Sequence, residues 1–115
     1  MEIERFDVGP RLSDMVKYNN TLYLAGQVPE DTTQDAKGQM TQVLGYVDAL
    51  LARAGSDKTR ILSVQIYLPD MADFEGMNAA WDAWVPAGHT PARATVQAKL
   101  ANPAWKVEIV VVAAA

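Results

Sequence analysis

The run VEIVVV, which begins at Val107, sharply narrows how this chain of 115 residues can fold. Successive side chains of a β-strand point to opposite faces. In such a strand Val107, Ile109 and Val111 lie on one face, and Val110 and Val112 lie on the other. Because both faces are apolar, both need a cover that excludes water. Either other parts of the chain supply two covers, or a second molecule supplies one.

Two segments have the periodicity of amphipathic helices and are available as covers. Between Met40 and Ala54 the apolar residues recur at helical spacing and trace one face, and Gly55 ends this helix. A second helix has Asp70 as its N-cap and runs to about Trp84. The candidate N-caps of the first helix are Asp31, Thr32 and Thr33.

The remaining segments predict strands. Ile61 to Leu68 alternates, with Leu62 on the same face as Val64. The pair Asn19-Asn20 predicts a hairpin turn, because asparagine tolerates positive φ. A closing hairpin is predicted around Asn102-Pro103. The predicted strands are Ile3 to Asp7, Asp14 to Tyr18, Leu22 to Gly26, Ile61 to Leu68, Arg93 to Leu100 and Trp105 to Ala113.

The predicted order of elements is β-β-β-α-β-α-β-β, which describes one α+β domain over residues 1–115. We expect a six-stranded, mainly antiparallel sheet with two helices on one face. Two helices cannot cover both faces of such a sheet. The second apolar face of the last strand therefore predicts that copies of the chain associate.

Composition excludes several kinds of chemistry. The chain has no cysteine, so it has no disulfide, thiolate nucleophile or thiolate metal site, and its one histidine, His89, leaves the usual zinc and serine–histidine sites incomplete. A net charge of −4 argues against nucleic acid as a partner. The sequence has no run of about 18 apolar residues, so it predicts no membrane span. The charged amino terminus lacks a signal-like apolar region, so we expect a cytoplasmic protein.

Arg93 and Glu108 place charges in two segments that otherwise look like buried strands. If the closing hairpin pairs Leu100 with Trp105, then Gln97 faces Glu108, and Arg93 shares that face roughly 13 Å away along the strands. A slip of one residue would put the two charges on opposite faces. Two interpretations stay open: ordinary charges at the rim of the sheet, or an anion site in which Glu108 orients or deprotonates a water.

The segment PARATVQAKLANPAWKVEI (Pro91 to Ile109) resembles the carboxy-terminal signature of the RidA/YjgF family. AGQVPE (Ala25 to Glu30), QVLGYVDALLARAGS (Gln42 to Ser56) and LPDMADFEGMNAAW (Leu68 to Trp81) resemble further stretches of the family, in the same order. The likeness is strongest to the small YoaB-type members, through NNTLY and WDAWV-AGH. The resemblance implies a chorismate-mutase-like α+β fold, a homotrimer and ligand clefts between its subunits.

The family resemblance also implies an activity: hydrolysis of small enamine or imine intermediates, such as 2-aminoacrylate, to 2-keto acids and ammonia, without metal or cofactor. By resemblance, Arg93 grips the substrate carboxylate and Glu108 positions water. Asn78, Thr95, Gly26 and Gln27 correspond to residues that bind substrate, although Asn78 can also be read as a core amide satisfied by backbone, and Gly26 and Gln27 as a plain turn.

Three positions depart from the archetypal family pattern: Leu12 stands near a usual tyrosine, Ala25 replaces a serine, and Thr95 replaces a cysteine. These changes keep a second hypothesis open, a non-catalytic protein that binds or senses 2-keto acids in the same cleft. A third hypothesis, a ribonuclease or translation inhibitor, fits the acidic composition least. Trp81 and Trp84 are interpreted as core or interface residues.

Overall fold

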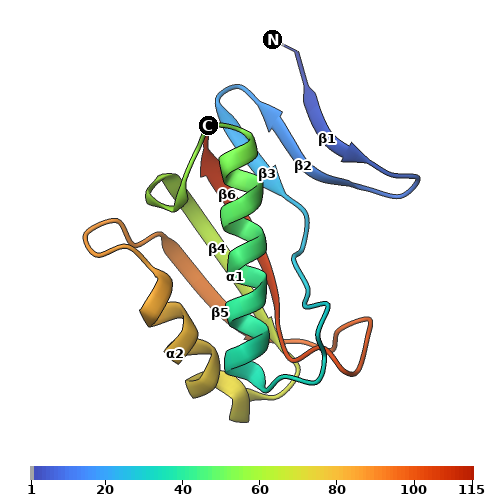
Figure 1. Ribbon diagram of the computed structural model, residues 1–115, viewed down its shortest axis with the longest axis vertical. Coiled ribbons are helices and arrows are strands. Elements are labelled where there is room, and N and C mark those ends of the chain that lie inside the picture. Colours follow the sequence, from blue (N-terminus) through green and yellow to red (C-terminus); the bar gives the residue numbers. More distant parts are fainter. Residues whose placement is uncertain (1) are drawn as a thin grey trace.

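The computed structural model describes residues 2–115, which form six strands and two α-helices (Figure 1). The order of elements predicted from the sequence is confirmed. The elements are β1 Glu4–Val8, β2 Ser13–Tyr18, β3 Thr21–Leu24, α1 Ala36–Arg53, β4 Ile61–Leu68, α2 Phe74–Trp84, β5 Ala92–Gln97 and β6 Glu108–Ala114.

The six strands form one sheet in the order β1-β2-β3-β6-β4-β5. Four of the five pairings are antiparallel, and β4 pairs with β5 in parallel, so the prediction of a mainly antiparallel sheet is confirmed. The β2–β3 hairpin turns at Asn19 and Asn20, whose φ angles are 52° and 65°. Both residues therefore adopt the left-handed conformation for which asparagine is suited.

The predicted closing hairpin is wrong, because β4 lies between β5 and β6. The cause is α2, which connects β4 to β5 as a crossover and so brings β5 beside β4 in parallel. The long connection from Ala98 to Val107 then carries the chain past β4, and β6 pairs with β3 and β4 in antiparallel.

This pairing also corrects the predicted relation between the two charges. Val64 pairs with Arg93 on one side and with Val111 on the other, so Arg93 shares the face of Val111. Glu108 pairs with Tyr67 and lies on the opposite face. Gln97 does not face Glu108. The charges lie on opposite faces because the residues with which they pair on β4, Val64 and Tyr67, are three positions apart, and successive side chains of a strand alternate between faces.

The two helices differ at their N-termini: α1 has a side-chain cap, whereas Asp73, the N-cap residue of α2, makes no capping hydrogen bond through its side chain. Asp35 caps α1 by accepting a hydrogen bond of 2.8 Å from the Gly38 N–H, so the helix begins before Met40 and the predicted caps were placed too early. Gly55, with φ of 75°, follows its end as predicted. Asp70, predicted to be the N-cap of the second helix, instead caps a short 3₁₀ turn over Met71–Asp73 that leads directly into α2.

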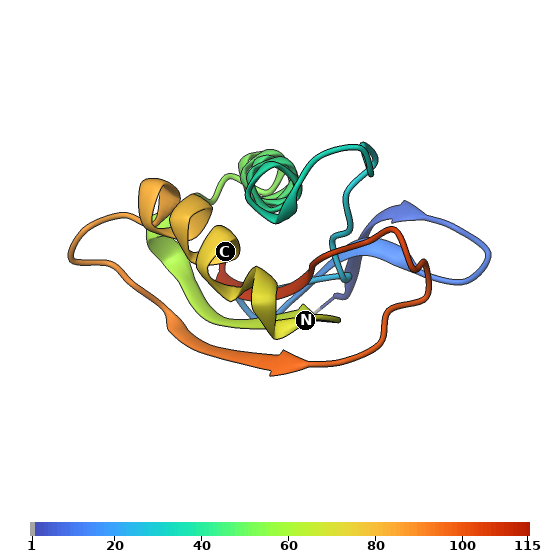
Figure 2. The ribbon, with the colours of Figure 1, turned by 90° about the horizontal axis from the view of Figure 1, so that it is seen from below.

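The two helices lie on one face of the sheet and enclose the core there (Figure 2). Met15, Leu22, Ile66 and Ile109 are fully buried beneath them. A β-bulge between Ile61 and Ser63 interrupts the predicted alternation. The core residues with 0% exposure are Met15, Leu22, Met40, Val43, Val47, Leu51, Ile66, Leu68, Met77, Val107, Ile109, Val111 and Ala113.

The bulge explains one wrong prediction at the start of β4. Leu62, predicted to share the buried face of Val64, is 53% exposed, whereas Ile61 is 6% exposed. An extra residue in one strand reverses the faces of the residues before it.

The second face of the sheet has no cover within residues 2–115 (Figure 2). Val110 and Val112 are half-buried on this open face, and Tyr23 and Val96 are 47% and 42% exposed. The prediction that the two helices leave one face bare is confirmed. Association of copies through this face stays a prediction.

Candidate functional site

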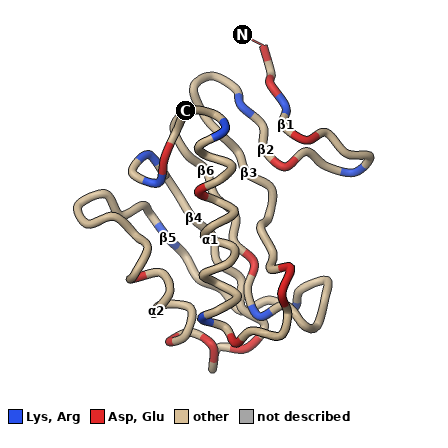
Figure 3. Tube along the Cα trace, viewed as in Figure 1, with Lys and Arg blue, Asp and Glu red and all other residues tan. Residues whose placement is uncertain are grey.

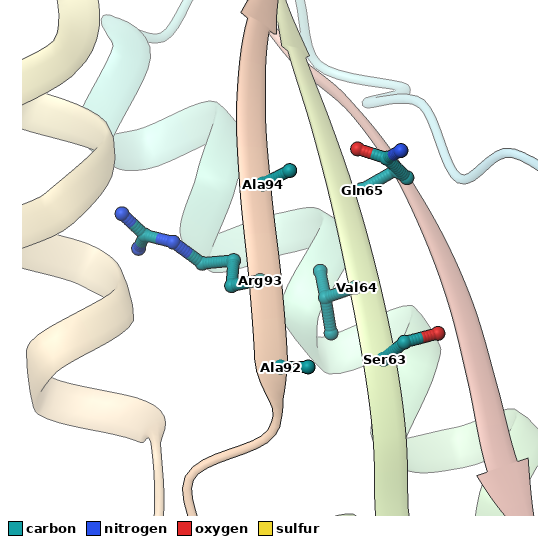
Figure 4. Close-up of a pocket in the computed structure, with 6 residues that line it drawn as sticks. All are labelled: Ser63, Val64, Gln65, Ala92, Arg93 and Ala94. Atoms are coloured by element: carbon teal, nitrogen blue, oxygen red, sulfur yellow. The ribbon is translucent and has the colours of Figure 1, made fainter.

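Arg93 extends from the edge strand β5 toward α2 (Figure 4). Its Nη1 donates a hydrogen bond of 2.8 Å to Oδ1 of Asn78, and its guanidinium carbon lies 5.2 Å from the centre of a Trp81 ring. The side chain is half-buried. A hydrogen bond and a cation–π contact therefore fix the guanidinium from two directions.

Asn78 and Trp81 of α2 both contact Arg93. Trp81 belongs to the buried stripe of the helix, where Met77 and Trp81 are 0% and 6% exposed, and Asn78 lies at the border of this stripe. The reading of Asn78 as a core amide satisfied by backbone is wrong, since its side-chain oxygen accepts from Arg93. The structure thus brings Asn78 and Arg93 together, as the family resemblance implied.

The charge of Arg93 is not neutralised by a carboxylate of the described chain. Within residues 2–115 the one ion pair joins Arg53 to Asp7, and the hydrogen bonds from Arg53 lower the pKa of Asp7. Arg93 is the single blue segment of β5 in Figure 3. Arginine has five N–H donors, and one of those on Arg93 has an acceptor among the described residues. The others are available to an anion.

Thr95 lies two residues after Arg93 and on the same face, since it pairs with the buried Ile66. Its Oγ1 is buried and has no hydrogen-bond partner among the described residues. A buried hydroxyl without a partner costs free energy. Thr95, which departs from the family pattern, therefore keeps a hydroxyl that is available to hydrogen-bond a ligand or water.

Glu108 lies at the start of β6 on the open face, where its carboxylate contacts the Gly26 backbone. A Cβ built on Gly26 would come within 3.0 Å of the Glu108 carboxyl carbon and closer still to its Oε2. Gln27 fixes this contact by exchanging backbone hydrogen bonds of 2.8 and 3.1 Å with Ile109. Gly26 and Gln27 are therefore joined to the strand that carries Glu108 and are not a plain turn.

The two halves of the predicted site lie apart within one chain. Their register positions on β4, Val64 and Tyr67, are three residues apart, and two strand spacings separate β5 from β6. Strand dimensions then put the Cα atoms of Arg93 and Glu108 about 14 Å apart, with the side chains on opposite faces. A single copy does not bring both side chains onto one small substrate.

A shallow hollow of about 270 Å³ lies over the open face of β4 and β5 (Figure 4). The Arg93 side chain points away from Ser63 and Gln65 and toward α2 (Figure 4). The residues that line the hollow are Ser63, Val64, Gln65, Ala92, Arg93 and Ala94. Neither Glu108 nor Asn78 lines it, so this hollow alone is not the predicted cleft.

Sequence reasoning missed the part that Trp81 plays beside Arg93. Trp81 was interpreted as a core or interface residue, and it is buried, but its ring also lies against the guanidinium. The available signal was its spacing: Trp81 follows Asn78 by one helical turn, so both side chains point the same way. His89 and Leu12, by contrast, are exposed.

Residues 2–115 contain no group of three or more His, Asp or Glu side chains placed to hold a metal ion. In the same residues neither α-helix has the length and apolar character needed to cross a membrane.

Comparison with known proteins places the chain in a family. The endoribonuclease L-PSP family model matches residues 3–115. The RutC family protein YoaB of Escherichia coli K12 is 54% identical over 114 residues, which cover 99% of each chain. A RutC family protein of Haemophilus influenzae is 53% identical, with 98% of each chain covered.

Solved structures agree with this assignment. A YjgF family member from Neisseria meningitidis superposes with a TM-score of 0.96 at 48% identity, over 99% of this chain and 95% of that chain. A Rid family protein from Yersinia pestis gives a TM-score of 0.85 at 28% identity, over 94% and 90%. The chain therefore belongs to the endoribonuclease L-PSP family, the family of the RutC and YjgF proteins, as the signature around Arg93 and Glu108 had indicated.

Proposed function

We propose that the protein is a deaminase that hydrolyses small enamine or imine intermediates bearing a carboxylate. Its substrate class is that of 2-aminoacrylate, whose imine form reacts with one water to give the 2-keto acid and ammonia. The observation that carries the proposal is Arg93, a half-buried arginine fixed by Asn78 and without a carboxylate partner in the described chain. Family membership supports the reaction class.

Arg93 is the group that grips the substrate carboxylate. A guanidinium presents paired N–H donors in one plane, which match the two oxygens of a carboxylate. Thr95, on the same face, offers its unpartnered Oγ1 to the substrate or to water. Asn78 contributes to the binding site by holding Arg93.

Glu108 is the group that positions and deprotonates the attacking water. Gly26 leaves the room in which its carboxylate lies, and Gln27 fixes that stretch of backbone. An imine carbon is already electrophilic when the nitrogen is protonated, so binding and a placed water supply what the reaction requires. We therefore include no metal or cofactor in the proposed reaction.

The active protein in this proposal is a homotrimer with the clefts between its subunits. Two features of the chain support this assembly: the open face is apolar, and Arg93 and Glu108 lie too far apart to act together within one copy. An arrangement that places Arg93 of one copy near Glu108 of a neighbour removes that difficulty and covers the open face at the same time.

The test is the rate of ammonia and 2-keto acid release from 2-aminoacrylate that a pyridoxal-phosphate enzyme generates in the assay. Arg93→Ala should lower kcat/KM by about 10- to 100-fold, since it removes charge-assisted hydrogen bonds to the carboxylate. Arg11→Ala, at an exposed arginine, is the matched control and should keep the wild-type rate. Equal rates for wild type and Arg93→Ala contradict the proposal.

A second candidate is a protein that binds 2-keto acids through Arg93 without turnover. Leu12, Ala25 and Thr95, which depart from the family pattern, favour it. Calorimetry with 2-ketobutyrate beside the activity assay separates the two: binding that depends on Arg93, with no acceleration of imine hydrolysis, selects this candidate.

A further inference from the structure

Arg93 is held by more than its hydrogen bond to Asn78. The guanidinium lies over Trp81, with 5.2 Å between the guanidinium carbon and the ring centre. An arginine side chain loses rotamer freedom when it is fixed, so a residue that fixes it before binding strengthens anion binding. The contact with Trp81 therefore bears on how well Arg93 is prepared for a carboxylate.

Trp81 is itself fixed from behind. It is 6% exposed, and its ring lies 5.5 Å from that of Trp84 at an interplanar angle of 50°. Trp84 is bound to the rest of the fold: its Nε1 donates a hydrogen bond of 2.9 Å to Asp48 on α1. The packing between the two helices thus determines where the Trp81 ring lies, whether or not a ligand is present.

Arg93, Trp81 and Trp84 contact one another in succession, and Lys58 lies against Trp84 at the other end of this row. Its Nζ lies 5.2 Å from the centre of a Trp84 ring and donates a hydrogen bond of 2.7 Å to the Trp84 carbonyl oxygen. Two indole rings are therefore flanked by two cations, Arg93 at one end and Lys58 at the other. Cation–π attraction favours both ends, and the Lys58 end is also anchored to the backbone.

We propose that Trp81 is a positioning residue that sets the plane of the Arg93 guanidinium, so that a carboxylate is bound in that plane. This inference rests on the proposed function for its ligand. The guanidinium carbon lies over the Trp81 ring, and Asn78 accepts one of the hydrogens on Nη1. The Nε and Nη2 donors, which lie along one edge of the guanidinium, have no acceptor among the described residues and can donate hydrogen bonds to both oxygens of one carboxylate.

The first experiment observes Arg93 in the free protein by NMR. In the wild type the Trp81 ring current should shift the Arg93 Hε and Hδ resonances, and rotation of the guanidinium should be slow. Trp81→Leu, which keeps an apolar side chain, should abolish the shift and speed the rotation, and Trp81→Phe should give intermediate values. Trp105→Leu, a tryptophan in the connection before β6, is the matched control and should leave Arg93 unchanged. Unchanged Arg93 resonances in Trp81→Leu overturn the proposal.

The second experiment measures steady-state kinetics and binding of 2-ketobutyrate by calorimetry. Trp81→Leu should raise KM and Kd by about 3- to 10-fold, the worth of one cation–π contact, with kcat changed less than about twofold. A purely structural role would lower kcat through loss of folded protein and leave KM unchanged. Equal Kd and KM values in Trp81→Leu and wild type also overturn the proposal. If the wild type neither binds nor turns over these compounds, the proposed function fails, and the NMR experiment on the free protein still decides whether Trp81 orients Arg93.

Discussion

The two faces of the sheet differ in the contacts that they provide to the residues of the candidate site. On the helix-covered face, Arg93 has a hydrogen bond to Asn78 and a ring beside it from Trp81. On the open face, the Glu108 side chain has no hydrogen-bond partner within residues 2–115, and its near neighbour is the backbone of Gly26. Within one copy of the chain, neighbouring side chains fix the Arg93 guanidinium, whereas no side chain fixes the Glu108 carboxylate.

The same difference appears in the apolar residues. Ile66 and Ile109, beneath the helices, are 0% exposed, whereas Tyr23 and Val96 on the open face are 47% and 42% exposed. Burial of apolar surface is worth about 25 cal/mol per Å², so a bare apolar face favours association. The helix-covered face contains the hydrophobic core of the single chain, and the open face carries the apolar surface that association with another copy would bury.

The largest effect is expected from a charge on the open face. Val112 is half-buried there between Tyr23 and Ser63. Val112→Asp should convert the assembly to single chains, because an unpaired carboxylate cannot be buried in an apolar contact. Sedimentation equilibrium should then give the mass of one chain, and deaminase activity should be lost with the assembly.

Val8→Asp is the matched control for this change, because Val8 is 70% exposed on β1. It should keep the mass of the wild type. A wild-type protein that already sediments as a single chain, or a Val112→Asp variant with unchanged mass, would contradict association of copies through the open face.

A smaller effect is expected from Gly26→Ala, which tests the Glu108 half of the site. The added Cβ would overlap the Glu108 carboxylate, and since that is the end of a flexible side chain, the carboxylate should move at little cost to stability. Turnover should fall by about 100-fold, the lower range for loss of a general base, while binding of 2-ketobutyrate stays within about threefold. Gly45→Ala, whose Cβ would meet nothing within 4 Å, is the control. Unchanged turnover in Gly26→Ala argues against Glu108 as the base.

The smallest effect is expected from Thr95→Val on the Arg93 side. Because the Thr95 Oγ1 has no partner in the free chain, its removal should leave the free energy of unfolding unchanged or raise it by about 1 kcal/mol. Affinity for 2-ketobutyrate should nevertheless fall by about 3- to 10-fold, the worth of one hydrogen bond. Urea unfolding and calorimetry measure the two quantities, with Thr90→Val at an exposed loop as the control. Stability and affinity that fall together would mean that Thr95 is a structural residue.

Local patterns predicted the elements well, because each depends on residues close in sequence. The bounds of β4, from Ile61 to Leu68, follow from alternation and from the proline after it, and Gly55 marks the end of α1. The strand pairing failed because nearness in sequence suggested a hairpin between the last two strands. The strand–helix–strand order of β4, α2 and β5 was the better signal, since such a unit brings its two strands together in parallel.

The signature around Arg93 named candidate residues for the site, and their roles stay predictions. The sequence did not give their geometry, including the contact between Arg93 and Asn78. The separation of Arg93 from Glu108 depends on the strand inserted between them, which no pattern near either residue specifies. The place of Trp81 beside Arg93 depends likewise on how α2 packs against α1.

The position of β5 at the edge of the sheet has one more consequence. Within the sheet this strand is hydrogen-bonded to β4 alone, so brief local opening readily exposes its amide protons to solvent. A ligand that joins Arg93 to a second copy in the proposed trimer should slow this exchange. Deuterium uptake along residues 92–97 should therefore report occupancy of the proposed site for any compound, without knowledge of the product that is formed.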